Sequence, residues 1–215
     1  WVSMTAVADE GGNHDGYVIL ANDLTAKRRY ERRLQWQAQR DPLVGVYNRR
    51  AFENFLQAEL ERASASQAPL ALVMFDIDHF KAINDTYGHL LGDDILKEIA
   101  GIASSRVRKA DVLARWGGEE FIVMLPDADA GGGQRLAESL REQVADADFP
   151  GPGRVTISLG VAELSQEDSL TTLVMRADAG LYSAKKAGRD RTVRAFGPGT
   201  PGQAEPVPED PGGLP

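Results

Sequence analysis

The chain has 215 residues, of which 42% are hydrophobic and 26% charged, so it can bury one substantial core but hardly two. Its net charge of −8 and isoelectric point near 5.0 argue against a protein that binds the nucleic-acid backbone. The lack of cysteine excludes disulfides and suits a reducing, cytoplasmic compartment, and no apolar run reaches the roughly 20 residues that cross a bilayer.

The first 40 residues divide into a strand pair and a helix. Residues 1–7 and 17–21 favour two strands joined by a polar turn, and two strands alone are not stable without a partner. Residues 25–40 favour an amphipathic helix with Thr25 at its N-cap. Its six Lys or Arg residues are interpreted as a solvated face of a helix that pairs with its twin, and not as a membrane or nucleic-acid contact.

Apolar spacing predicts the elements of the remaining chain, in which residues 154–162 alternate as a strand with one better-buried face does. Residues 197–215 hold six of the eleven prolines and no basic residue, which predicts a disordered tail. We expect helices at residues 48–65, 79–85, 93–108, 131–147 and 169–186, and strands at 69–76, 154–162 and on both sides of a hairpin at 117–121.

A continuous apolar run over residues 70–75 predicts a strand that is buried on both faces and ends in acids. Carboxylates at the end of a buried strand are costly unless they are paired or bind a metal. Asp76 and Asp78 would share a face of the strand end, with the carbonyl of Ile77 between them. The strand end is therefore a candidate cation site.

Two glycines and two acids follow one another between two extended runs at residues 117–120. A Gly–Gly pair there predicts a hairpin turn, because both residues tolerate positive φ. A solvated turn that happens to be acidic is the plain alternative. Together with Asp76 and Asp78, however, Glu119 would supply the hard oxygen ligands that Mg²⁺ prefers beside substrate phosphates.

The order and spacing of these motifs resemble the GGDEF family of diguanylate cyclases from about Asp41 to Thr192. The resemblance implies a mixed α/β (α+β) fold with a central, mostly antiparallel sheet flanked by helices, similar to the palm of nucleotidyl cyclases. It also implies condensation of two GTP into cyclic di-GMP and two pyrophosphates by a homodimer of half-sites, with Mg²⁺ for which Mn²⁺ can substitute. The matching motifs are Asp41–Arg50, Phe75–Lys81, Asn84–Asp85, Gly88–Asp93, Gly117–Phe121, Ser158–Ala162 and Ala177–Arg189.

The resemblance carries roles onto individual positions. Glu120 would stand beside the metal as a candidate to assist deprotonation of the attacking 3′-hydroxyl, in a catalytic set with Asp76 and Glu119. The implied metal ligands are Asp76, the Ile77 carbonyl and Glu119, the implied guanine ligands are Asn84 and Asp93, and the implied phosphate ligands are Phe80, Lys81, Lys185 and Arg189.

Structural alternatives exist for several of these residues. Lys185 and Arg189 lie near the end of a predicted helix, where cations are favoured in any case. Asn84 and Asp93 could be a turn residue and a helix N-cap. Three positions depart from the family pattern, and none removes a needed chemical group: Val44 for Thr, Glu119 for Asp and Asp190 for Asn.

The motif Arg108-Lys109-Ala110-Asp111 stands five residues before Gly117, as the family's product-inhibition motif does. An arginine fork can bind guanine O6 and N7, and a carboxylate can accept from guanine N1 and N2. Cyclic di-GMP is therefore the expected product and inhibitor, bound by Arg108 and Asp111. The motif alone is more often a surface ion pair.

The expected organisation has four parts: the end of a PAS-like sensor domain at residues 1–24, a helical signalling linker at 25–40, the cyclase domain at 41–196 and the tail at 197–215. A protein containing this chain could carry a membrane anchor upstream. Two rival functions are a catalytically silent module that binds cyclic di-GMP and another nucleotidyl cyclase, such as an adenylyl cyclase, on the same fold. Guanine-reading side chains at Asn84 and Asp93 would speak against the latter.

Overall fold

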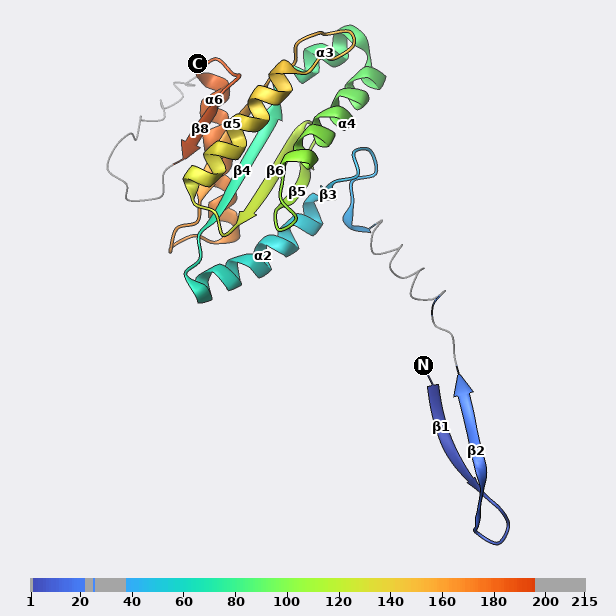
Figure 1. The fold of residues 1–215 in the computed structure, drawn as a ribbon. Helices are drawn as coiled ribbons and strands as arrows, with labels where there is room; N and C mark the ends of the chain where they lie inside the picture. Colours follow the sequence, from blue (N-terminus) through green and yellow to red (C-terminus); the bar gives the residue numbers. More distant parts are fainter. Residues whose placement is uncertain (1, 22–24, 26–37, 196–215) are drawn as a thin grey trace, which may run out of the picture.

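The computed structural model describes residues 2–21, 25 and 38–195, which contain two separate sheets (Figure 1). β1 (Val2–Ala8) and β2 (His14–Ala21) form an antiparallel hairpin, as the sequence predicted. Most of the expected helix at 25–40 and the tail at 197–215 lie outside the described residues. No helix of the described part has the length and apolar character that a bilayer span requires.

The larger sheet has six strands in the order β3-β5-β6-β4-β7-β8. Its four inner strands pair antiparallel, whereas β3 and β8 pair parallel to their neighbours at the two edges. The strands are β3 (Tyr47–Asn48), β4 (Leu70–Ile77), β5 (Val112–Gly117), β6 (Glu120–Pro126), β7 (Ile157–Glu163) and β8 (Thr192–Ala195), and the helices are α2 (Arg49–Ser66), α3 (Phe80–Tyr87), α4 (His89–Arg106), α5 (Ala130–Asp146) and α6 (Leu170–Lys186).

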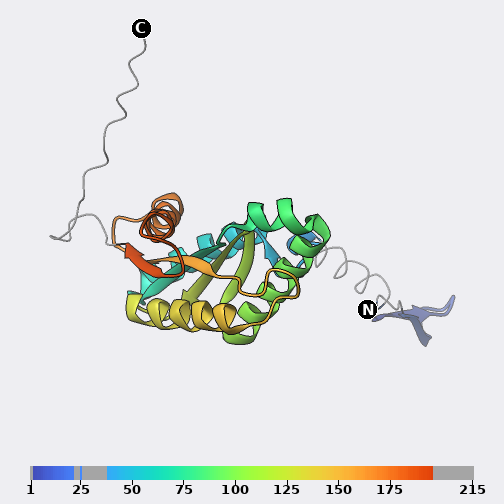
Figure 2. The same ribbon diagram turned by 90° about the horizontal axis from the view of Figure 1, so that it is seen from above.

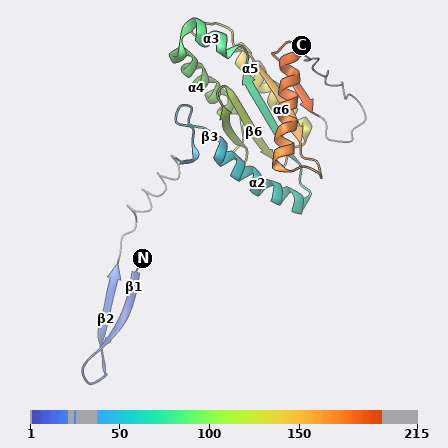
Figure 3. The ribbon, with the colours of Figure 1, turned by 180° about the vertical axis from the view of Figure 1, so that it is seen from behind.

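Helices cover both faces of this sheet. Seen from above, α4 and α5 lie on one face and α6 on the other (Figure 2), and the view from behind shows α2 beside α6 (Figure 3). Two apolar clusters fill the layers, one between the sheet and α4 and α5, the other between the sheet and α2 and α6. The predicted central, mostly antiparallel sheet flanked by helices is confirmed.

β4 is buried along its whole length and divides its side chains between the two clusters. Val73 and Phe75 pack toward α4 and α5, while Leu72 and Met74 pack toward α2 and α6. β7 is likewise buried on both faces, so the predicted one-sided burial of residues 154–162 is wrong. The reason is its position between β4 and β8, with α5 and α6 on opposite faces.

The helix boundaries show one notable difference from prediction. α4 begins at His89, four residues earlier than expected, because Gly88 at φ +85° ends α3 and starts α4 with no intervening loop. The edge strands β3 and β8 were not predicted at all. Both are short, with two and four residues, so they carry little periodic signal of their own.

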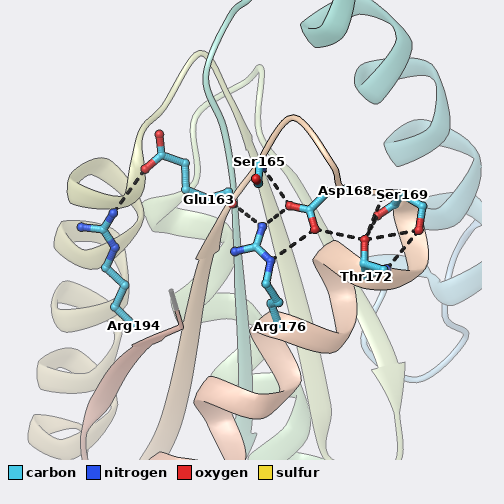
Figure 4. A network of polar contacts seen from close by, with 7 residues as sticks. All are labelled: Glu163, Ser165, Asp168, Ser169, Thr172, Arg176 and Arg194. Carbon is cyan, nitrogen blue, oxygen red and sulfur yellow. Dashed lines mark hydrogen bonds and ion pairs between the residues drawn. The ribbon is translucent and has the colours of Figure 1, made fainter. Parts of the chain in front are cut away.

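A polar network fixes the connection between β7 and α6 (Figure 4). The side chain of Asp168, only 2% exposed, pairs with Arg176 and accepts hydrogen bonds from Ser165 N at 2.8 Å and Thr172 Oγ1 at 3.0 Å. Arg176 also donates to the main-chain oxygen of Glu163 at the end of β7. Burial alone would raise the pKa of Asp168, but the hydrogen bonds and charge of Arg176 lower it below its usual value.

α6 approaches β7 so closely that only glycine fits between them. A Cβ at Gly160 would lie 2.1 Å from the main-chain oxygen of Ala177 and 2.2 Å from the main-chain nitrogen of Leu181. These are backbone atoms that cannot move away without shifting the helix. The distance of α6 from the sheet is therefore set by this glycine.

We predict that Gly160→Ala lowers the free energy of unfolding by about 1–3 kcal/mol or more, because the added methyl forces α6 off the sheet. The matched control is Gly101→Ala on the exposed face of α4, where a Cβ meets nothing within 4 Å. That change should raise stability by about 0.5–1 kcal/mol through helix propensity. Urea unfolding measures both, and equal stabilities for the two variants would contradict the account.

Candidate active site

Of the acids predicted to form a site, Asp76, Glu119 and Glu120 lie near one another at one end of the sheet. Asp76 on β4 lies directly opposite Glu120 on β6 in the antiparallel ladder. Lys185, at the end of α6, reaches the same point and pairs its Nζ with Asp76 Oδ2 at 2.8 Å. The side chain of Asp76 is only 8% exposed and that of Lys185 30%, so the pair is largely shielded from water.

Burial and neighbouring acids at this end of the sheet raise the pKa of two carboxyl groups. Burial raises the pKa of Asp76 to about 6; Lys185 opposes the rise, and the charges of Glu119 and Glu120 add to it. Burial also raises the pKa of Glu120, with contributions from Asp178 and Glu119. A site that disfavours its own carboxylates in this way favours an added cation.

The turn between β5 and β6 carries Glu119 at its tip. Gly117 is the last residue of β5 and pairs with Glu120, so the turn consists of Gly118 and Glu119, and of the two glycines only Gly118 has a positive φ. The Gly–Gly turn expected from the sequence is thus displaced by one residue. Glu119 therefore belongs to the turn, while Glu120 is the first residue of β6.

The side chain of Arg115 stabilises this turn through hydrogen bonds. Its Nε and Nη2 donate to the Gly118 carbonyl at 2.8 and 2.6 Å, and its Nη1 donates to Asp41 Oδ1 at 3.2 Å. Asp41 in turn accepts from the main-chain nitrogens of Leu43 and Val44. Arg115 is not among the site residues predicted from the sequence, although its position two residues before Gly117 is a usable signal.

Asp78 does not join Asp76 as a free ligand. Its carboxylate accepts hydrogen bonds from Thr156 Oγ1 and Ser158 Oγ, both at 2.7 Å, and from the main-chain nitrogen of Asp190 at 3.1 Å. These three donors occupy both of its oxygens. The expectation that Asp78 supplies a metal ligand is therefore not supported, and Asp78 instead ties the end of β4 to the segments on either side of it.

A cleft of about 430 Å³ opens beside the turn, with Asn84 and Asp93 among its lining residues. The Oδ1 of Asn84 is buried and has no hydrogen-bond partner in the described part of the chain. A Cβ at Gly92 would lie 1.9 Å from that oxygen, so a larger residue there would displace the Asn84 side chain. The cleft is lined by Phe80, Lys81, Asn84, Asp85, His89, Asp93, Leu96, Arg115, Gly118 and Glu119.

The cleft brings together five of the predicted site residues and settles one alternative. Asp93 lies in the second turn of α4 and not at its N-cap, which is Gly88, so the capping interpretation is wrong. His79, the N-cap residue of α3, has φ +58° and makes no side-chain cap hydrogen bond. The first main-chain nitrogens of a helix have no partner within it. Lys185 contacts Asp76 beside the cleft, whereas neither Lys185 nor Arg189 lines it.

The donor set for a metal is small. Within residues 2–21, 25 and 38–195, no three His, Cys, Asp or Glu side chains come close enough to hold a metal ion by themselves. A metal at Asp76 and Glu119 would need the Ile77 carbonyl and oxygens from a ligand to complete its shell. Mg²⁺ accepts such an arrangement, because it commonly binds one or two carboxylates plus substrate phosphates.

A second pocket, of about 240 Å³, contains the Arg108 motif. The main-chain nitrogen of Arg108 donates to Asp111 Oδ2 at 2.7 Å, so the carboxylate closes its own turn. The pocket is lined by Arg106, Arg108, Asp111, Leu125, Ala128, Gly132, Arg135, Leu136 and Ser139. Two of its arginines, Arg106 and Arg135, were not anticipated: Arg106 ends α4 two residues before Arg108, and Arg135 comes from α5.

Comparison with known proteins identifies the family. The family model "Diguanylate cyclase, GGDEF domain" matches residues 38–191. Diguanylate cyclase DgcP of Pseudomonas aeruginosa is 44% identical over 154 residues, covering 70% of this chain and 23% of that protein. Diguanylate cyclase DgcM of Escherichia coli is 38% identical over 178 residues, covering 83% and 43%. The chain thus spans less than half the length of these two curated relatives.

The fold has matching solved structures. The coiled coil and GGDEF domain of DgcB from Caulobacter crescentus, in complex with c-di-GMP, superposes with a TM-score of 0.76 at 29% identity. That match covers 80% of this chain and 93% of the DgcB chain. Diguanylate cyclase SiaD of Pseudomonas aeruginosa, in complex with its activator SiaC, matches with a TM-score of 0.73 at 38% identity, covering 79% of this chain and 66% of that chain.

We predict that Asp76→Asn stabilises the ligand-free protein at pH 7–8 by about 1–2 kcal/mol. Because the pKa of Asp76 is raised, the folded state disfavours its charge, a cost that is absent below its ordinary value of 3.8 and complete above about 6. The gain should therefore shrink as the pH falls from 6 toward 4. Urea unfolding across this range tests it, and a variant less stable at every pH would contradict it.

Proposed function

The chain belongs to the GGDEF family of diguanylate cyclase domains, and we propose that it condenses two GTP molecules into cyclic di-GMP with release of two pyrophosphates. One observation carries the proposal: Asp76, Glu119 and Glu120 meet at one end of the sheet, and Glu119 also lines the cleft that contains Asn84 and Asp93. Acids that crowd beside a cleft of nucleotide size suit metal-assisted nucleotidyl transfer.

The cleft is proposed to select guanine through Asn84 and Asp93. The carboxylate of Asp93 can accept from the N1 and N2 hydrogens of guanine, which adenine lacks. The unpartnered Oδ1 of Asn84 is a buried acceptor that needs a donor, and a bound base can provide one. This arrangement supports GTP as substrate over ATP.

We propose Mg²⁺ as the cofactor, with Mn²⁺ able to substitute, held by Asp76, the Ile77 carbonyl and Glu119. The fit rests on the carboxylates themselves, whose burial and mutual repulsion favour a cation. When bound, the metal would lower the pKa of the attacking hydroxyl and stabilise charge on the phosphate. Glu120, whose pKa is raised, would assist removal of the proton from the 3′-hydroxyl.

The phosphates are proposed to bind where α3 begins. The free main-chain N–H groups at Phe80 and Lys81 suit an anion, and the ammonium of Lys81 adds charge. Arg189 follows α6 in a left-handed conformation at φ +62° and, with Lys185, would contact the outer phosphates. These four residues would hold the pyrophosphate as it leaves.

A homodimer follows from the chemistry of the product. Each 3′-hydroxyl attacks the α-phosphate of the other GTP, so two new phosphodiester bonds form and two pyrophosphates leave. With one GTP bound in each cleft, two copies would face each other across a two-fold axis. The reaction rate should therefore rise with the population of dimer.

We also propose that cyclic di-GMP inhibits the enzyme from the Arg108 pocket. Arg108 and Asp111 offer the donors and acceptor that guanine requires, and Arg106 and Arg135 surround the same pocket with positive charge. We further propose that the chain is organised as a fragment of a PAS-like sensor domain at residues 1–24, a helical signalling linker at 25–40, the cyclase domain at 41–196 and a tail at 197–215.

We predict that Glu119→Ala or Asp76→Ala abolishes turnover while leaving the fold intact, since each removes a metal ligand. The assay supplies GTP and Mg²⁺, with ATP in parallel, and detects cyclic di-GMP and pyrophosphate by mass spectrometry. Asp94→Ala is the control, because Asp94 points to solvent and pairs with Lys97. No product from the unchanged protein, even at concentrations that force dimerisation, would favour a silent module that binds cyclic di-GMP.

We predict that Arg108→Ala relieves inhibition by cyclic di-GMP at least tenfold without lowering the initial rate, because the pocket loses its guanine donor. The measurement is the initial rate of pyrophosphate release over a series of added cyclic di-GMP concentrations. Lys109→Ala, next in sequence but not part of the pocket lining, is the matched control. An unchanged inhibition constant in Arg108→Ala would show that the motif is only a surface feature.

A further inference from the structure

We propose that Lys185 is an internal cation that occupies Asp76 until nucleotide arrives, so that metal enters the site together with GTP and not before it. The inference rests on the proposed function, and it adds an order of binding to it. Lys185 would exchange one negative partner, the carboxylate of Asp76, for another, the phosphates of GTP. The oxygen that it leaves would then be available to the metal.

The contact that carries this inference is direct and shielded. Lys185 Nζ lies 2.8 Å from Asp76 Oδ2, and that carboxylate is only 8% exposed. A metal at Asp76 would bind the same carboxylate, so the ammonium and the metal would compete for it. The next residue is arranged differently, because Lys186 Nζ lies 4.6 Å from the ring centroid of Tyr182.

The surrounding charges explain why the protein needs a cation here in the absence of ligand. Asp76, Glu119 and Glu120 repel one another at the end of the sheet, and Asp178 adds a further negative charge near Glu120. The positive charge of Lys185 stabilises the charged forms of both Asp76 and Glu120. A buried carboxylate without any counter-charge would be strongly destabilising, and Lys185 supplies that charge from within the chain.

Lys185 should have opposite effects on metal affinity in the absence and in the presence of nucleotide, and this difference can be measured. Without nucleotide, Lys185 should weaken metal binding, both by occupying an oxygen and by electrostatic repulsion. With nucleotide, the triphosphate attracts both Lys185 and the metal, so each ligand should strengthen the other. The coupling between nucleotide and metal should then depend on Lys185.

The test measures Mn²⁺ binding by electron paramagnetic resonance to the full chain, with and without a non-hydrolysable GTP analogue. Without nucleotide, Lys185→Met should bind Mn²⁺ about tenfold or more tightly than the unchanged protein, since the competing charge is gone. Lys186→Met should leave the affinity unchanged. The analogue should tighten Mn²⁺ binding strongly in the unchanged protein and much less in Lys185→Met.

Equal Mn²⁺ affinities of Lys185→Met and the unchanged protein without nucleotide would overturn the inference, provided that the analogue still promotes Mn²⁺ binding. No Mn²⁺ binding by the unchanged protein in either condition would instead overturn the proposed metal site itself. Circular dichroism checks that the variants are folded. Lys185→Gln, which keeps a polar side chain of similar length, repeats the test if Lys185→Met does not fold.

Discussion

The structure depends on how it accommodates carboxylates at the end of a fully buried strand. β4 is apolar along nearly its whole length and is flanked on both edges and both faces, so its end offers little water to an acid. The charges of the two acids there, Asp76 and Asp78, are stabilised in different ways. Asp78 is satisfied by three hydrogen-bond donors, whereas Asp76 keeps a raised pKa and a single ammonium partner.

Asp78 therefore has a structural role, whereas Asp76, two residues earlier, has the character of a functional residue. Asp78 joins β4 to the segments around Thr156 and Asp190 and thereby holds the end of the strand in place. Asp76 retains an unfavourable charge that a ligand can relieve, which is the usual character of a functional site. Arg115 extends the same support to the turn, since it links the Gly118 carbonyl to Asp41, the residue that follows Arg40 at the entry to the domain.

Much of this was predictable from the sequence, because the signals were local. The continuous apolar run before Asp76 identified the buried strand, and the glycines at 117 and 118 identified the hairpin. The cleft residues on α3 and α4 were expected from the resemblance to the GGDEF family. What the sequence did not reveal depends on contacts between distant segments: the hydroxyls that bind Asp78, the approach of Arg135 to Arg108, and the burial of β7 on both faces.

The close packing of α6 on Gly160 has a consequence for motion. Because the backbones of α6 and β7 are already in contact, the helix cannot roll or sink toward the sheet without a collision. Lys185, at the end of that helix, can therefore change partner only by rotating its own four-carbon chain. The exchange would then need only a rotation of one lysine side chain and no domain movement, and side-chain rotations are faster than helix displacements.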